Sequence, residues 1–144
     1  MKEITLSIAD SIADGAIEAC RLNGFNDFAV TVVDATGKQI VHKVMDGQNS
    51  PAIPLYAIAK AYTCIATMMS SREFRDKYTK DDNVGRYCQM LSMVSITGGK
   101  LAPFPGGVLI KNTEGKIIGA VGCSGASADE DEYCALMGIE LSGI

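Results

Sequence analysis

The sequence predicts an α+β fold in which amphipathic helices cover both faces of a largely antiparallel sheet. Two pairs of β-branched segments each flank a short turn, and strands joined by tight turns pair antiparallel. Segments with helical periodicity surround these hairpins, in the order helix, hairpin, helix, helix, hairpin, helix. Since 144 residues, 47% of them apolar, can bury one core but not two, we expect one three-layer domain over residues 1–144.

The first helix is predicted to begin after Thr5, whose hydroxyl can cap it. Its apolar side chains recur at four-residue spacing, and the Asn23-Gly24 pair ends it; they are Ile8, Ile12, Ala16 and Cys20. The first hairpin lies in the stretch FAVTVVDATGKQIVHKVMDG, with its turn at residues 34–37.

A second helix is predicted over residues 55–69, after the chain breaks at Pro51 and Pro54. Its most apolar face is predicted to meet the core; this face comprises Leu55, Ile58, Ala59, Tyr62, Ala66 and Met69. The opposite face carries an aligned stripe, Tyr56, Lys60, Thr63 and Thr67, that fits solvent exposure, a ligand site or a subunit contact.

The polar segment 70–89 is predicted to be helical after a cap at Ser70 or Ser71, with a loop at residues 81–85. The short apolar run 91–96 is predicted to be a strand. A second hairpin pairs residues 108–111 with residues 117–121 around the turn 112–115. Both of its strands are apolar at nearly every position, so helices should cover both faces of this part of the sheet.

A last helix is predicted after Ser127, which forms a capping box with Glu130. Four acidic residues stand together at its start, residues 129–132, and capping needs only one or two of them. The surplus negative charge therefore suggests a second role for this helix start.

Composition and charge exclude several classes of function. The net charge of −4 and the pI of about 4.9 disfavour nucleic acid and anionic membranes as partners. The five cysteines contain no C-x-x-C pair, so neither a disulfide framework nor a zinc site is indicated. Acidic residues interrupt the amino-terminal segment where an export signal would be apolar, and no run of about 20 apolar residues is present. We therefore expect a soluble cytoplasmic protein.

Familiar catalytic and nucleotide-binding motifs do not fit. The glycines at 119, 122 and 125 lack the G-x-G-x-x-G spacing, and Gly98-Gly99-Lys100 is followed by Leu101 rather than by the serine or threonine of a phosphate-binding loop. Cys123 at a strand end, with His42 as its base, is a weak candidate nucleophile, because a lone cysteine there usually packs.

Three features are predicted to converge on one hollow. They are the paired glycines Gly106 and Gly107, the amine of Lys60 and the carboxylate of Asp131. A partly buried Lys60 could act as a base or bind a carboxylate or carbonyl, and Asp131 could be its acid-base partner. Further ligand-binding candidates around them are Asp46, Thr63, Phe104 and Glu132.

His42, the one histidine of the chain, is predicted to share a strand face with Ile40 and Val44. Such a histidine is more often a hydrogen-bonded core residue than a ligand. It is nevertheless the candidate axial ligand if the protein binds haem.

The sequence also resembles the GlcG-like family of glycolate-utilisation and haem-binding proteins, whose domain is also called haem-degrading. The resemblance runs from about residue 4 to residue 141. Its motifs are Val33-Asp34 with Gly37, Met45-Asp46-Gly47, Ala57 with Lys60-Ala61 and Thr63, Gly106-Gly107-Val108, Gly119-Ala120-Val121-Gly122, Ser124-Gly125-Ala126 and Asp131-Glu132.

The resemblance implies a profilin-like α/β/α sandwich with a five-stranded antiparallel sheet, assembled into homo-oligomers. Two positions depart from the family pattern. Val44 stands where the family usually has an arginine, and Leu109 stands where it usually has a proline. Loss of that arginine removes a cation that could hold a carboxylate or propionate, and the histidines proposed as haem ligands in the family lie at other positions.

Three functions remain open at this point. The first is binding of haem or a small ligand, with His42 or a methionine as axial donor and with cations at Lys60, Arg72, Arg75 and Arg86 for the propionates. The second is acid-base or isomerase/lyase-type catalysis by Lys60 and Asp131 on a small carbonyl or carboxylate compound of a catabolic pathway. The third is an oligomeric accessory protein in which the Tyr56, Lys60 and Thr63 stripe only packs against another subunit.

Overall fold

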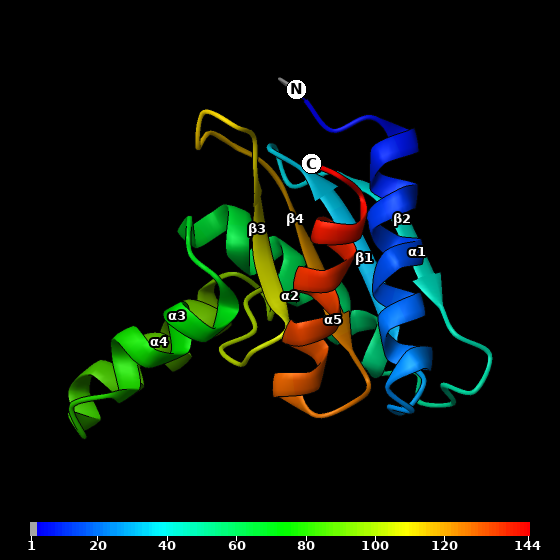
Figure 1. Cartoon of the computed structure of the whole chain (residues 1–144). Coiled ribbons are helices and arrows are strands. Elements are labelled where there is room, and N and C mark those ends of the chain that lie inside the picture. The colour runs from blue at the N-terminus through cyan, green and yellow to red at the C-terminus, as the bar shows by residue number, and fades with distance from the viewer. Residues whose placement is uncertain (1–2) are drawn as a thin grey trace.

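The computed structural model describes residues 3–144 as an α+β fold around a four-stranded antiparallel sheet (Figure 1). The strand order is β2-β1-β4-β3, so the two hairpins lie side by side and are joined by the central β1 and β4. The elements are α1 (Leu6–Leu22), β1 (Ala29–Asp34), β2 (Gln39–Val44), α2 (Ile53–Thr67), α3 (Ser71–Thr79), α4 (Val84–Ile96), β3 (Gly107–Lys111), β4 (Ile117–Ser124) and α5 (Ala128–Leu141).

Helices cover both faces of the sheet, which confirms the predicted layers. Helices α1 and α5 pack together on one face, and α2 crosses the other face (Figure 1). The larger core lies between the sheet and the α1–α5 pair, where alternate strand residues such as Val30, Val32 and Val121 meet Ile12 and Ala16 of α1. A smaller core lies under α2 and includes Val33, Ala61, Cys64 and Ala120.

The described chain forms four strands where five were expected, because residues 91–96 belong to α4 and are not a strand. Asn83 caps this helix by accepting a hydrogen bond from the Arg86 amide at 3.2 Å. Met90, Met93 and Val94 then follow at helical spacing and pack in a third cluster with Phe74 and Leu101. A short apolar run does not distinguish a strand from part of a helix by itself.

Helix α2 presents the opposite face to the sheet from the one predicted. Ala57, Lys60, Ala61, Thr63 and Cys64 are buried, whereas Leu55 of the predicted core face is 63% exposed. Two strand glycines explain this orientation. A β-carbon on Gly122 would lie 2.2 Å from the Ala57 carbonyl oxygen, and one on Gly107 would lie 2.4 Å from that of Lys60. The helix backbone therefore approaches the sheet so closely that only small side chains fit between them.

Helices α3 and α4 project beyond the sandwich (Figure 1). Ser70 rather than Ser71 caps α3, in a capping box with Glu73. Among residues 3–144, no helix combines the length and apolar character needed to span a membrane.

Candidate functional site

Lys60 and Asp131 form an ion pair inside the protein. Lys60 Nζ lies 3.2 Å from Asp131 Oδ2, and the two side chains are 1% and 2% exposed. Lys60 lies on α2 and Asp131 lies on α5, so the pair links the two helical layers across an end of the sheet. Lys60 Nζ also donates to the Cys123 carbonyl near the end of β4 at 2.9 Å, and Asp131 Oδ1 accepts from the Ala126 amide at 3.0 Å.

The turn formed by Gly106 and Gly107 contacts the Lys60–Asp131 pair at Lys60, as the sequence predicts. Gly106 has φ = 134°, a conformation that side chains disfavour, and a β-carbon there would lie 2.6 Å from Lys60 Nζ. The Phe104 ring lies 4.9 Å from Lys60 Nζ and meets the Tyr56 ring edge to face. Gly107 is held separately, because its amide donates to the Ser71 hydroxyl at 2.8 Å. Backbone and aromatic atoms therefore enclose the amine.

Burial and charge act in opposite directions on this pair. Burial lowers the pKa of the Lys60 ammonium, and the nearby Asp131 carboxylate only partly opposes this effect. Burial likewise raises the pKa of Asp131, against the opposing effects of Lys60 and the Ala126 amide. Each charge is therefore costly in this place unless the other one is present.

The surplus acid at the start of α5 has separate partners. Glu130 completes the predicted capping box with Ser127, and Asp131 pairs with Lys60. Arg72 at the start of α3 bonds Glu132 at 3.0 Å through Nε and also bonds Asp129. The hydrogen bonds that Arg72 donates to these two carboxylates raise the pKa of its guanidinium, so it remains charged. The helix start thus ties α5 to both α2 and α3.

The other ligand-binding candidates do not gather at this pair. The Thr63 hydroxyl donates to the Ala59 carbonyl and accepts from the Ala102 amide, both at 2.7 Å, so it holds the loop before β3 against α2. Asp46 is exposed in the turn after β2. The idea that Tyr56, Lys60 and Thr63 form a subunit contact is wrong for Lys60 and Thr63, because both are buried within their own chain.

The glycines, the amine and the carboxylate therefore converge, but none of the three hollows described here is lined by Lys60 or Asp131. The arrangement has the chemistry of a structural ion pair, with every described polar contact made inside the protein. Among residues 3–144, no group of three histidine, cysteine or acidic side chains is placed to hold a metal ion.

An open hollow of about 450 Å³ lies instead beside the outer face of α2. Its volume is within the range of small-molecule sites. The apolar side chains that were expected in the core line it, together with the loop after α4; its residues are Val33, Gly37, Gln39, Leu55, Ile58, Ala59, Tyr62, Gly98, Gly99 and Lys100. Lys100 is exposed and provides a cation at this hollow.

His42 lies on the same side of the sheet as this hollow. The prediction that Ile40 shares its face is wrong, because Ile40 packs with the core on the α1 side of the sheet. The partner of His42 in the β1–β2 register is Thr31, whereas Gln39 pairs with Val33, two residues or about 7 Å further along β1. A register irregularity beside Val33 allows Gln39 and His42, three residues apart on β2, to share this face. The Thr31 hydroxyl lies 2.7 Å from His42 Nδ1, which leaves Nε2 for another partner. Part of the ring is open to solvent, and the burial of the rest lowers the pKa of His42. The imidazole is therefore neutral at physiological pH.

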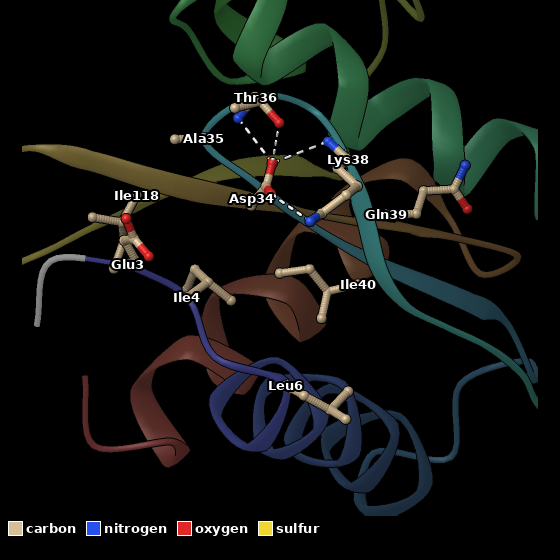
Figure 2. A pocket seen from close by; sticks show the side chains of 10 residues that line it. All are labelled: Glu3, Ile4, Leu6, Asp34, Ala35, Thr36, Lys38, Gln39, Ile40 and Ile118. Carbon is tan, nitrogen blue, oxygen red and sulfur yellow. Dashed lines mark hydrogen bonds and ion pairs between the residues drawn. The ribbon is translucent and has the colours of Figure 1, made fainter.

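A second hollow, of about 560 Å³, lies between the start of α1 and the β1–β2 turn (Figure 2). Asp34 Oδ1 accepts hydrogen bonds there from the Thr36 and Lys38 amides at 2.8 and 3.1 Å. Burial by itself raises the pKa of Asp34, but the hydrogen bonds from the Thr36 hydroxyl and from these two amides outweigh it, and the pKa is lowered. Lys38 at the edge of this hollow is paired with Asp34 at 3.8 Å, and Glu3 adds a further negative charge, so the lining does not favour an anionic ligand.

Comparison with known proteins agrees with this architecture. Residues 4–140 match the family model described as haem degrading protein HbpS-like. The chain belongs to the HbpS-like family. No curated protein sequence matches it significantly.

Solved structures with the same fold include HbpS itself. A PduOC–heme complex superposes with a TM-score of 0.82 at 23% identity, covering 96% of this chain and 94% of that chain. Protein ORFY from Klebsiella pneumoniae gives 0.85 at 19% identity, with coverages of 99% and 92%. A double mutant of HbpS from Streptomyces reticuli gives 0.79 at 25% identity, with coverages of 98% and 88%. The two structures below 25% identity show likeness of fold alone.

Sequence reasoning missed the hollow on α2 because it assigned Leu55, Ile58 and Tyr62 to the core. The available signal was the small-residue face of the same helix, Ala57, Ala61 and Cys64, which suits close packing on glycine-rich strands. It also missed Thr31, which orients His42 and which no local motif connects to it.

Proposed function

We propose that this HbpS-like protein binds haem, or a flat apolar ligand of similar charge, in the hollow between α2 and the β1–β2 half of the sheet. The observation that supports this most directly is the apolar hollow of about 450 Å³ with His42 on the adjoining strand face. Haem needs an apolar slot, cations for its propionates and an axial donor. Family membership supports the same ligand class.

His42 remains the axial donor that the sequence predicts, but the cation at the hollow is Lys100, which was not among the four expected. His42 offers a neutral imidazole whose other nitrogen is already held by Thr31, an arrangement that favours metal ligation. Lys100 offers one cation for a propionate. Lys60, Arg72 and Arg75 already pair with carboxylates, and Arg86 donates to the Lys77 carbonyl, so these four cations are not the propionate partners. When bound, haem would supply iron-centred chemistry that these side chains lack.

Catalysis by Lys60 and Asp131 has less support. The Lys60 amine and the Asp131 carboxylate form their hydrogen bonds with groups inside the protein, and Phe104 and Gly106 lie against the Lys60 amine. A substrate would have to displace the glycine turn to reach either group.

Hemin titration of protein without a histidine tag tests the proposal. The wild type should bind about one equivalent and give a sharpened Soret band, and His42→Ala should lose that band because the chain then contains no histidine. A broad spectrum like that of hemin with an unrelated acidic protein, or a band unchanged by His42→Ala, would count against His42 ligation.

A charge reversal tests the position of the ligand. Lys100→Glu should weaken hemin binding about tenfold, the effect of roughly 1.4 kcal/mol. Lys116→Glu makes the same change at an exposed lysine in the β3–β4 turn and should leave binding unchanged. Equal effects of the two variants would place the ligand outside this hollow.

A further inference from the structure

Gln39 begins β2 at the edge of the hollow on α2, and its side chain is exposed there. Its neighbour Ile40 is an extra residue in the strand, because Gln39 and Val41 on either side of it pair with consecutive residues of β1. Regular alternation would put Gln39, three residues before His42, on the opposite face. The bulge at Ile40 instead turns Gln39 toward the hollow, and Figure 2 shows Gln39 and Ile40 on different sides of β2.

The carboxylate of Asp34 holds the turn that precedes Gln39. Asp34 Oδ1 accepts from the Thr36 amide at 2.8 Å, from the Thr36 hydroxyl at 2.7 Å and from the Lys38 amide at 3.1 Å (Figure 2). Asp34 and Thr36 line the hollow beside α1. Gly37 and Gln39, later in the same segment, line the hollow on α2. Asp34 therefore fixes one wall of the α2 hollow from outside that hollow.

The polar side chains at the α2 hollow are few. Lys100 is the one charged residue of its lining, and Gln39 and Tyr62 are uncharged and polar. Tyr62 is half-buried and packs in the cluster that contains Phe74 and Leu101, whereas Gln39 is exposed at the rim. A primary amide has two N–H donors, and hydrogen bonds to an ionised acceptor are the stronger ones. A ligand with two carboxylates therefore meets one ammonium and one amide here.

We infer that the Gln39 amide donates a hydrogen bond to a carboxylate of the ligand in the α2 hollow, and that Asp34 positions Gln39 for this contact. The inference rests on the proposed function, because it concerns the ligand of the same hollow. It adds selectivity to that function, since a ligand of the same shape without carboxylates gains nothing from the amide as a partner of charge.

Hemin titration of Gln39→Glu tests the contact. The new carboxylate repels a propionate and donates no hydrogen bond, so hemin should bind about tenfold more weakly. Gln89→Glu is the matched control, because Gln89 is exposed on α4 and its replacement changes the net charge equally; it should leave binding unchanged. With hemin dimethyl ester, whose propionates are uncharged, Gln39→Glu and the wild type should differ by less than about twofold.

Asp34→Ala tests the positioning. The second hairpin supplies the control, because Asn112 Oδ1 accepts from the Glu114 and Lys116 amides at 2.9 and 3.0 Å in the same way. Asp34→Ala and Asn112→Ala should lower the urea midpoint by similar amounts, but only Asp34→Ala should weaken hemin binding, by about fivefold. Asp34→Asn keeps an oxygen that accepts these hydrogen bonds, so it should bind hemin like the wild type.

The outcomes separate this inference from the proposed function. A wild type that does not bind hemin would overturn both. Binding that requires His42 but weakens equally in Gln39→Glu and Gln89→Glu would overturn the inference alone. An equal loss of affinity for hemin and for its dimethyl ester in Gln39→Glu, or equal effects of Asp34→Ala and Asn112→Ala on hemin binding, would overturn it as well.

Discussion

Replacing Lys60 with methionine should destabilise the fold severely, although methionine has nearly the same length and is apolar. The substitution leaves the Asp131 carboxylate 2% exposed and without its cation, which lies 3.2 Å away in the native protein. At that distance two unit charges attract by about 5 kcal/mol for an effective dielectric constant near 20. Breaking one side of a buried pair costs about 3–5 kcal/mol, a large part of the 5–15 kcal/mol that stabilises a typical domain.

Urea denaturation followed by circular dichroism measures this effect. A cost of about 4 kcal/mol with a slope near 2 kcal/mol/M lowers the midpoint by about 2 M. The double variant Lys60→Met with Asp131→Asn removes both charges, and its amide oxygen can still accept from Ala126. It should recover most of the loss, since neutral replacements of a buried pair are often tolerated.

The comparison of single and double variants decides the argument. A Lys60→Met cost below about 1 kcal/mol, or a double variant no more stable than the single one, would show that the pair is not mutually compensating in the protein interior. Either result would favour a catalytic or binding role for Lys60 and Asp131 over a structural one.

Two further predictions concern the same region and the opposite sheet edge. Gly106→Ala should lower the free energy of unfolding by about 3 kcal/mol or more in urea denaturation, because the new β-carbon would lie 2.5 Å from the Cys123 carbonyl oxygen. The control Gly115→Ala has open space around its β-carbon and φ = 80°, so it should cost about 1 kcal/mol. Equal costs would contradict the tight packing of Gly106. The single histidine should titrate by NMR with a midpoint below 6.5, since burial lowers the pKa of His42. Below that pH the folded state then binds fewer protons than the unfolded state, so the free energy of unfolding should rise with pH up to about 6.5. This rise should be absent in His42→Ala. An NMR midpoint above 6.5 would contradict the effect of burial on His42.

Local signals in the sequence were sufficient for most elements. Thr5 and Ser127 form the expected helix caps, and both hairpins turn where the sequence predicts. Each of these depends on neighbours within a few residues, which the sequence displays directly. The run 91–96 was assigned wrongly because its helical periodicity emerges only when Met90 is counted with Met93 and Val94.

The site could be predicted only in part. Lys60, Asp131 and Gly106 were expected together and are together, but whether they surround a hollow depends on how closely α2 approaches the sheet. That distance depends on residues far apart in the sequence and cannot be predicted from local patterns. The sequence therefore could not show that the Lys60–Asp131 pair is enclosed, or that Leu55 and Ile58 line an open cavity.

The sequence by itself determined the order of the elements apart from α4, and also the antiparallel hairpins, because propensity, capping and periodicity act over short stretches of chain. Only the tertiary structure decided which face of α2 is buried, and that Lys60 crosses between layers to reach Asp131. The physical reason is that glycines on β3 and β4, far from α2 in sequence, let two backbones pack closely, and that contact orients every side chain of the helix.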